Sequence, residues 1–295
     1  MLEKLKANIF FNKFLQRPDI NKAYAMVQKS DSWYDTISTV HNSLKEILHM
    51  PHDEVQIKSD DGLILKGIYY KNNYNSDVTV ICVHGYQSHA EREWAFPGLF
   101  YLSLGYNVLI PYQRAHGLSE GKYISLGGLE HLDILNWVKK VNEMNPNNKI
   151  IIHGLSMGGG IVLDLVDKEM KNVKCLISDA PTISIKNFFI NVTKEVFKKN
   201  PEKIAFYAIR RYEKEFGVNI EQYEALDLLK NCKYPILLAA GSNENMDDVF
   251  ERIKNINPNN TEIIILPGCS HGNGMYKQTE LFQSTIKAFI NKYID

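Results

Sequence analysis

The stretch that decides the fold is KIIIHGLSMGGGIVLDLV, residues 149–166. It joins an apolar run of strand length to an apolar helical pattern through a glycine-rich turn, and Ser156 stands at the centre of that turn. A nucleophile raised on a sharp turn needs small neighbours, because its backbone is strained and adjacent segments come very close. G-x-S-x-G alone occurs often by chance, but its setting between a strand and a helix predicts a nucleophilic Ser156.

A phosphate-binding loop is the alternative interpretation of this glycine-rich turn. The motif G-x-x-x-x-G-K-[ST] is absent, and Ser156 occupies the place of the second glycine in G-x-G-x-x-G. The sequence therefore favours the nucleophile.

Further apolar runs of strand length lie on both sides of the turn, alternating with helix-length segments. They cover residues 78–83, 107–111, 149–153, 173–178, 235–240 and 262–266. Continuous apolar runs are typical of a parallel sheet that is covered on both faces. Residues 55–58 and 63–70, separated by a turn at Asp60, Asp61 and Gly62, predict a β-hairpin before them. The sequence thus predicts an α/β fold with a mostly parallel eight-stranded sheet covered by helices.

Three units are expected along the chain. Residues 1–50 show helical apolar spacing and form an N-terminal helical extension, whereas residues 51–181 and 235–295 form the α/β core. Residues 182–234 are too long for a simple crossover, and they are expected to form a helical cap or lid. Phe188 and Phe189 of this cap are candidates for substrate binding because they belong to an apolar stripe at helical spacing.

The N-terminal helices are expected to pack on the main domain or on a partner subunit, which makes a homodimer possible. A membrane-surface role is the alternative, because Lys6, Lys13 and Arg17 flank an apolar group made of Phe10, Phe11 and Phe14.

Charge and cysteine content exclude several classes of protein. Lys and Arg number 34, Asp and Glu also number 34, and the pI is about 7.1, so a nucleic-acid partner is not expected. The four cysteines, Cys82, Cys175, Cys232 and Cys269, form no C-x-x-C pair and are expected to be reduced thiols of a cytoplasmic protein. No apolar run reaches the roughly 18 residues of a membrane span, and none resembles a signal sequence.

His271 is the candidate base, in a loop directly after the run 262–266. Loops at the carboxyl ends of parallel strands gather at one edge of a sheet, so this loop is expected to lie beside Ser156. The acid should come between nucleophile and histidine along the chain. Glu244 is the preferred acid, because it directly follows a strand end, and Asp247 is the alternative. Asp248, like Asp247, also suits the first turn of a following helix.

The segment His84-Gly85-Tyr86-Gln87 follows the run 78–83 and supplies a candidate oxyanion hole. The backbone amides of Tyr86 and Met157 are expected to bind the oxygen that becomes negative during acyl transfer. The imidazole of His84 is interpreted as a core group bonded to backbone. His116 lies in a loop that could line the site, and it is a further substrate-binding candidate.

Together these motifs resemble the α/β-hydrolase superfamily, and most closely its bacterial esterase-like members with an N-terminal helical extension. The resemblance rests on Gly154–Gly159, His84-Gly85, the segment Arg114–Gly121 and His271, and it covers about residues 53–295. In that family the acid typically follows the glycine that ends the seventh strand by three residues, which corresponds to Glu244. The family more often carries Asp there, and its loop usually reads Asp-x-Arg-Gly-His-Gly where this chain has Tyr112–Gly117.

The resulting expectation is a serine hydrolase of the carboxylesterase type, acting on an ester or related acyl substrate through an acyl-enzyme. A peptidase or an acyltransferase would use the same residues, and a degenerate hydrolase acting as a binding protein is the alternative from another class. No cofactor and no metal are expected, since neither H-E-x-x-H nor a cysteine pair is present.

Overall fold

The computed structural model describes residues 2–19, 33–72, 76–220 and 225–294. Its centre is one sheet with the strand order β1-β2-β4-β3-β5-β6-β7-β8. The strands are β1 (Asp53–Lys58), β2 (Ile64–Tyr70), β3 (Val78–Val83), β4 (Asn107–Pro111), β5 (Lys149–Leu155), β6 (Val173–Asp179), β7 (Ile236–Gly241) and β8 (Thr261–Leu266). Strand β2 pairs antiparallel with both neighbours, while β4, β3, β5, β6, β7 and β8 pair in parallel. The predicted hairpin and the mostly parallel eight-stranded sheet are confirmed.

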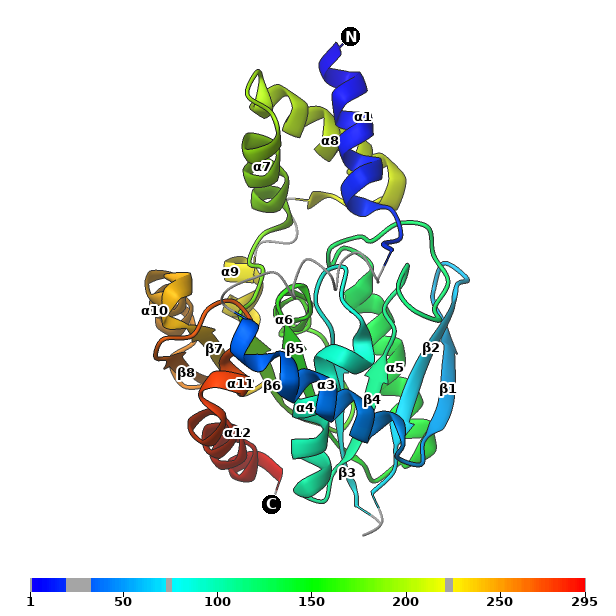
Figure 1. The fold of residues 1–295 in the computed structure, drawn as a ribbon, viewed down its shortest axis with the longest axis vertical. Coiled ribbons are helices and arrows are strands. Elements are labelled where there is room, and N and C mark those ends of the chain that lie inside the picture. Colours follow the sequence, from blue (N-terminus) through cyan, green and yellow to red (C-terminus); the bar gives the residue numbers. More distant parts are fainter. Residues whose placement is uncertain (1, 20–32, 73–75, 221–224, 295) are drawn as a thin grey trace.

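Helices cover both faces of this sheet (Figure 1). On one face lie α3 (Ile37–Leu48), α4 (Ala90–Ser103) and α12 (Thr279–Ile294), and on the other lie α5 (Glu130–Met144), α6 (Met157–Leu163) and α10 (Asp247–Ile256). Alternate residues of one strand enter different cores: Val80 and Cys82 belong to the first, Ile81 and Val83 to the second. Because both faces of the sheet are buried, the strand sequences are nearly continuous apolar runs.

A small helical lobe stands at one end of the molecule, at the top of Figure 1. It consists of α7 (Ile185–Val196), α8 (Pro201–Phe216) and the N-terminal helix α1 (Leu2–Leu15). The ring centroid of Phe10 in α1 lies 6.0 Å from that of Phe189 in α7, and Arg211 of α8 donates to the carbonyl of Asn8 over 2.9 Å. The first helix therefore packs on the cap helices. In contrast, α3 packs on α4 of the core.

The remaining elements are short turns of helix. They are η1 (Tyr34–Thr36), α9 (Ala225–Leu228), η3 (Leu229–Asn231), η4 (Ser242–Glu244) and α11 (Gly274–Lys277). Within the described ranges, no helix has both the length and the apolar character needed to cross a membrane. The division into an extension, a core and a cap stays a proposal. Of the two long helices described before residue 50, α1 packs on the cap helices and α3 on the core.

Candidate active site

Ser156 forms the turn between β5 and α6, with backbone angles φ 59° and ψ −115°. These angles are rare for a residue with a side chain, so the turn depends on tight packing around it. A Cβ atom on Gly158 would lie 1.9 Å from the carbonyl oxygen of Val83, and one on Gly154 would lie 2.1 Å from that of Gly158. Only glycine fits at both positions, which explains the G-x-S-x-G pattern.

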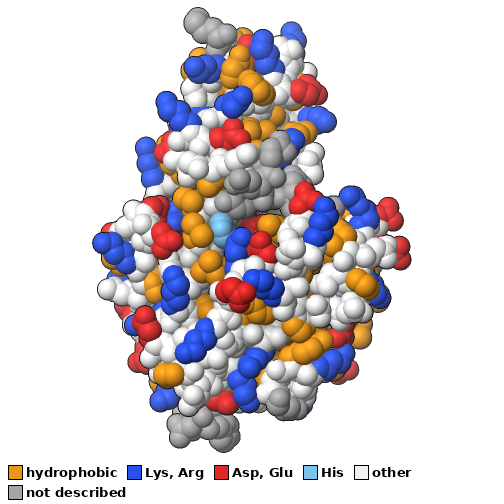
Figure 2. Space-filling view, turned by 180° about the vertical axis from the view of Figure 1, so that it is seen from behind, with side chains coloured by type: hydrophobic (Ala, Val, Ile, Leu, Met, Phe, Trp, Pro, Cys, Tyr) orange, Lys and Arg blue, Asp and Glu red, His pale blue; other side chains and the backbone are white. Residues whose placement is uncertain are grey.

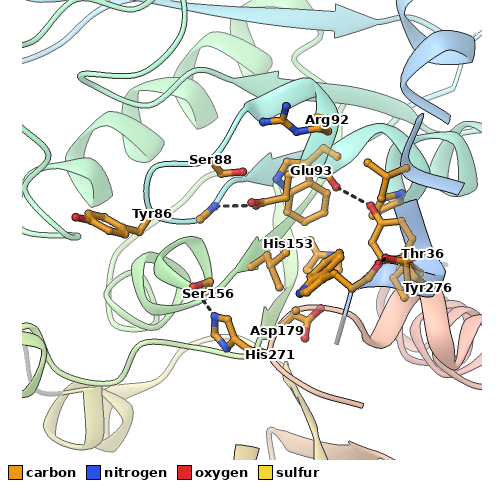
Figure 3. Close-up of a pocket in the computed structure, with 18 of the residues that line it drawn as sticks. Thr36, Tyr86, Ser88, Arg92, Glu93, His153, Ser156, Asp179, His271 and Tyr276 are labelled. Carbon is orange, nitrogen blue, oxygen red and sulfur yellow. Dashed lines mark hydrogen bonds between the residues drawn. The ribbon is translucent and has the colours of Figure 1, made fainter. Parts of the chain in front are cut away.

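The structure brings Ser156, His271 and Glu244 into one hydrogen-bonded chain. Nε2 of His271 lies 2.8 Å from Oγ of Ser156 (Figure 3), and Nδ1 of His271 lies 2.6 Å from Oε2 of Glu244. His271 lies in the loop after β8, and Glu244 in η4 directly after β7. The other carboxylate oxygen of Glu244 accepts from the backbone N–H of Gly241 over 2.8 Å. Both oxygens of this carboxylate are therefore held in place.

Asp247, the alternative acid of the sequence analysis, lies outside this chain. It is exposed in the first turn of α10. A carboxylate there interacts favourably with the positive end of the helix dipole, which is a sufficient structural reason for its presence.

The hydrogen bond that Nδ1 of His271 donates to Glu244 raises the pKa of His271 above its ordinary value, and partial desolvation opposes this effect. The negative charges of Glu244, Asp179 and Glu93 act in the same direction as the hydrogen bond. The imidazolium that would form when His271 accepts a proton is thus electrostatically stabilised at this place.

The loop after β3 approaches Ser156 closely. A Cβ atom on Gly85 would lie 3.2 Å from Cβ of Ser156, so a side chain there would fit only if its neighbours shifted slightly. Tyr86 follows in this loop and lines the neighbouring cavity, and Met157 follows Ser156 as the first residue of α6. Both residues are near Ser156, and the role of their amides in an oxyanion hole stays a prediction. As predicted, His84 is buried and its ring nitrogens pair with Gly85 and Gln113 backbone.

A cavity of about 390 Å³ opens beside Ser156 and His271 (Figure 3). Most of its wall is apolar, with Ile37, Val40, Pro97, Leu155 and Met275 among the lining residues. One side of the wall comes from the N-terminal segment, which contributes Trp33, Thr36, Ile37 and Val40. The ring centroid of Trp33 lies 5.5 Å from that of Tyr276 in α11, and this contact joins the N-terminal segment to the region after β8.

Two carboxyl groups that the sequence analysis did not select also line the cavity. Burial raises the pKa of Glu93 to about 7 and that of Asp179 to about 8, where the charge of Glu244 adds to the effect. Glu93 accepts from the backbone N–H of Gly85 over 2.7 Å. Asp179 ends β6 and pairs in register with Leu155 of β5. Its position at the end of the strand beside the Ser156 turn was a signal available in the sequence.

The predicted substrate contacts lie outside this cavity. Phe189 is fully buried, and its ring centroid lies 5.4 Å from that of Tyr212. Phe188 is half-buried and packs edge-on against Tyr86, with the ring centroids 5.6 Å apart. His116 is buried with its ring 4.7 Å from that of His84. None of the three is among the described residues that line the cavity. Phe189 and His116 have sufficient packing roles in the structure, and substrate binding by all three stays a prediction.

Among the described residues, no group of three or more His, Cys, Asp or Glu side chains is arranged to hold a metal ion. All four cysteines are free, and Cys82, Cys175 and Cys269 are buried.

Residues 74–215 match the family model described as serine aminopeptidase, S33. Over 119 residues the chain is 34% identical to the uncharacterized protein YqkD of Bacillus subtilis (strain 168), and the match covers 40% of this chain and 38% of that relative. The chain thus spans well under half the length of this curated relative.

Among solved structures, the esterase Pf2001 of Pyrococcus furiosus is similar with a TM-score of 0.66 and 28% identity, over 85% of this chain and 94% of that chain. Est1E of Butyrivibrio proteoclasticus, solved with ferulic acid bound, has a TM-score of 0.63 and 20% identity, over 81% of this chain and 99% of that chain. The second likeness concerns the fold alone.

Proposed function

The chain belongs to the α/β-hydrolase superfamily, and from this premise we propose that it is a serine hydrolase that cleaves a carboxylic ester or a related acyl substrate. The observation that carries the proposal is the continuous chain from Ser156 Oγ through both ring nitrogens of His271 to the Glu244 carboxylate. A hydroxyl is a weak nucleophile, and such a chain activates it.

In the proposed mechanism, Nε2 of His271 takes the hydroxyl proton while Oγ of Ser156 attacks the acyl carbonyl carbon. Glu244 holds the proton on Nδ1 and stabilises the imidazolium. The amides of Tyr86 and Met157 donate hydrogen bonds to the tetrahedral oxyanion. His271 then gives its proton to the leaving alcohol, which leaves Ser156 acylated. Water attacks this acyl-enzyme with His271 again as the base, and the free acid departs.

The decisive test combines a fluorophosphonate label, located by mass spectrometry, with a panel of p-nitrophenyl esters of rising acyl length. Labelling at Ser156 together with turnover supports the proposal. A chain that neither takes the label nor cleaves any ester would instead be a degenerate hydrolase that acts by binding.

Activity is expected to depend on pH through His271. The base is active only when unprotonated, so kcat/KM should rise with pH as His271 loses its proton. Because Glu244 raises the pKa of His271, the midpoint should lie above the ordinary histidine value of about 6.5. Glu244→Gln removes the cause of the increase, and the midpoint of its residual activity should move to lower pH. A midpoint that does not differ between the two proteins would contradict the coupling.

The apolar wall of the cavity suggests that it holds the acyl chain of the substrate. Val40, almost fully buried in this wall, offers a way to shorten the cavity. Val40→Phe should lower kcat/KM for a hexanoyl ester by about tenfold or more, because each methylene bound in an apolar pocket contributes a factor of about that size to kcat/KM. The kcat/KM for an acetyl ester should be nearly unaffected. Leu48→Phe is the matched control, since Leu48 lies exposed on the same helix and away from the cavity. An equal loss of kcat/KM on both esters would show that the cavity does not bind the acyl chain.

A second candidate function, an aminopeptidase, is favoured by one specific observation. The carboxyl groups of Glu93 and Asp179 both line the cavity beside Ser156, and an ammonium group bound between them would restore their ionised forms. Turnover of alanine p-nitroanilide, with none of its N-acetyl derivative and little of simple esters, would favour this function. Arg92 lines the same cavity, and its positive charge weakens the case for a cationic ligand.

A cytoplasmic location belongs to the proposal as well. Its support is that the four cysteines form no disulfide bond with one another, which suits a reducing compartment.

A further inference from the structure

Helix α1 has apolar side chains on two opposite faces. Ala7, Phe10, Phe11 and Leu15 are buried against the cap and the core. Leu2, Leu5 and Ile9 recur at helical spacing on the opposite face, and their exposed fractions are 60%, 57% and 58%. The outer face of a surface helix is normally polar. An exposed apolar stripe on such a helix marks a surface that contacts something else.

Exposed lysines lie at the same end of the lobe as the start of this stripe. The turn between α7 and α8 is fixed against the start of α1, because Asn200 donates to the carboxylate of Glu3 over 3.1 Å. The ammonium group of Lys6 lies 6.0 Å from the ring centroid of Phe197 at the same turn. Lys198, Lys199 and Lys203 are all exposed there. We call Leu2, Leu5, Ile9 and these three lysines the cap tip.

The lobe that carries the cap tip differs in charge from the rest of the molecule. Residues 2–19 and 182–220 contain twelve Lys and Arg against six Asp and Glu, whereas the whole chain contains 34 of each. The lobe is therefore basic and the remainder is acidic. Figure 2 shows Lys and Arg side chains spread over this lobe at the top of the view, with apolar side chains between them.

We propose that the cap tip docks on the surface of an anionic lipid bilayer. Exposed leucine and isoleucine side chains on a helix insert into the boundary between headgroups and acyl chains, and flanking lysines pair with anionic headgroups. The structure revises the sequence-based alternative of a membrane role, because Phe10 and Phe11 are buried in the lobe. The lipid-facing side is the opposite face of the same helix.

A second copy of this chain fits the cap tip less well. A symmetric contact between two cap tips would bring the lysines of one copy against those of the other, and like charges that face each other oppose association. An anionic membrane offers both complementary charge and an apolar boundary. The proposal is independent of the chemistry at Ser156.

The test is co-sedimentation of the full chain with vesicles. One set contains phosphatidylcholine alone, and the other contains phosphatidylcholine mixed with phosphatidylglycerol. The chain should pellet with the mixed vesicles only. A lysine near an anionic surface raises the affinity for the membrane about fivefold. The triple variant K198E/K199E/K203E should therefore bind the mixed vesicles about a hundredfold or more weakly than the natural chain does. The variant L5N/I9N should also bind more weakly, because it removes the inserted side chains.

The matched control is K58E/K254E/K287E, which changes the net charge equally at three exposed lysines of the core. It should bind nearly as the natural chain does. The circular dichroism spectrum and the melting temperature of each variant report that it has folded. The proposal is overturned if the natural chain does not pellet with mixed vesicles, or if the control loses as much binding as the cap-tip variant. It is also overturned if L5N/I9N binds vesicles normally and instead converts a dimer to a monomer in analytical ultracentrifugation.

Discussion

Replacing Ser156 by alanine is expected to lower kcat by about 10⁶, the size of loss known when a triad serine is removed. The loss is large because no other group in the hydrogen-bonded chain can form the acyl-enzyme. His271 and Glu244 would remain, but with no hydroxyl between the imidazole and the substrate they have nothing to activate. The measurement is turnover of p-nitrophenyl butyrate beside intact-mass detection of a fluorophosphonate adduct, and the variant should show neither.

The matched control for this prediction is Ser88→Ala. Ser88 lines the same cavity, so the label can also reach it, yet it lies outside the hydrogen-bonded chain. This variant should keep the adduct and lose at most a small part of the turnover. Labelling of Ser88 in the natural chain, or activity that survives in Ser156→Ala, would show that the nucleophile is another residue.

The sheet could be predicted because its strands are buried on both faces. Burial on both faces favours apolar residues at consecutive positions, as in Val80–Val83 and Ile150–Ile152, and this pattern is visible in the sequence before the packing partners are known. The Ser156 turn was visible for a different reason: the approach of Val83 and Gly158 leaves no room for a side chain. Strong local constraints restrict the residue types at these positions, and the restriction can be recognised in the sequence.

The cavity could not be predicted in this way. Its wall combines Val40 from the N-terminal segment, Pro97 from α4 and Met275 after β8, which are far apart along the chain. The spacing of apolar residues shows that a helix has one face to bury, but it does not identify the surface that receives it. The same limit applies to α1, where Phe10 and Phe11 are buried and Leu5 is exposed although all three are apolar.

Glu244→Gln is expected to lower kcat by about 10⁴, the loss that accompanies the wrong histidine tautomer in serine proteases. The structure explains why glutamine cannot replace glutamate here. One carboxylate oxygen accepts from the N–H of Gly241 and the other faces Nδ1 of His271. A glutamine that keeps its oxygen toward Gly241 presents its amide N–H to Nδ1. Nδ1 must then be unprotonated, and the ring proton moves to Nε2, where it blocks acceptance of the Ser156 proton.

The opposite orientation of this glutamine is no better, because its amide N–H would then face the N–H of Gly241, and two donors would meet. The control is Asp247→Asn, which changes an exposed carboxylate in the first turn of α10. It should cost about 1 kcal/mol or less in unfolding free energy, as a lost partner of the helix dipole does, and leave kcat unchanged. Single-turnover kinetics and urea unfolding of both variants separate these effects. If Asp247→Asn lost the activity and Glu244→Gln kept it, the orienting acid would be Asp247, and the contact seen between Glu244 and His271 would have only a structural role.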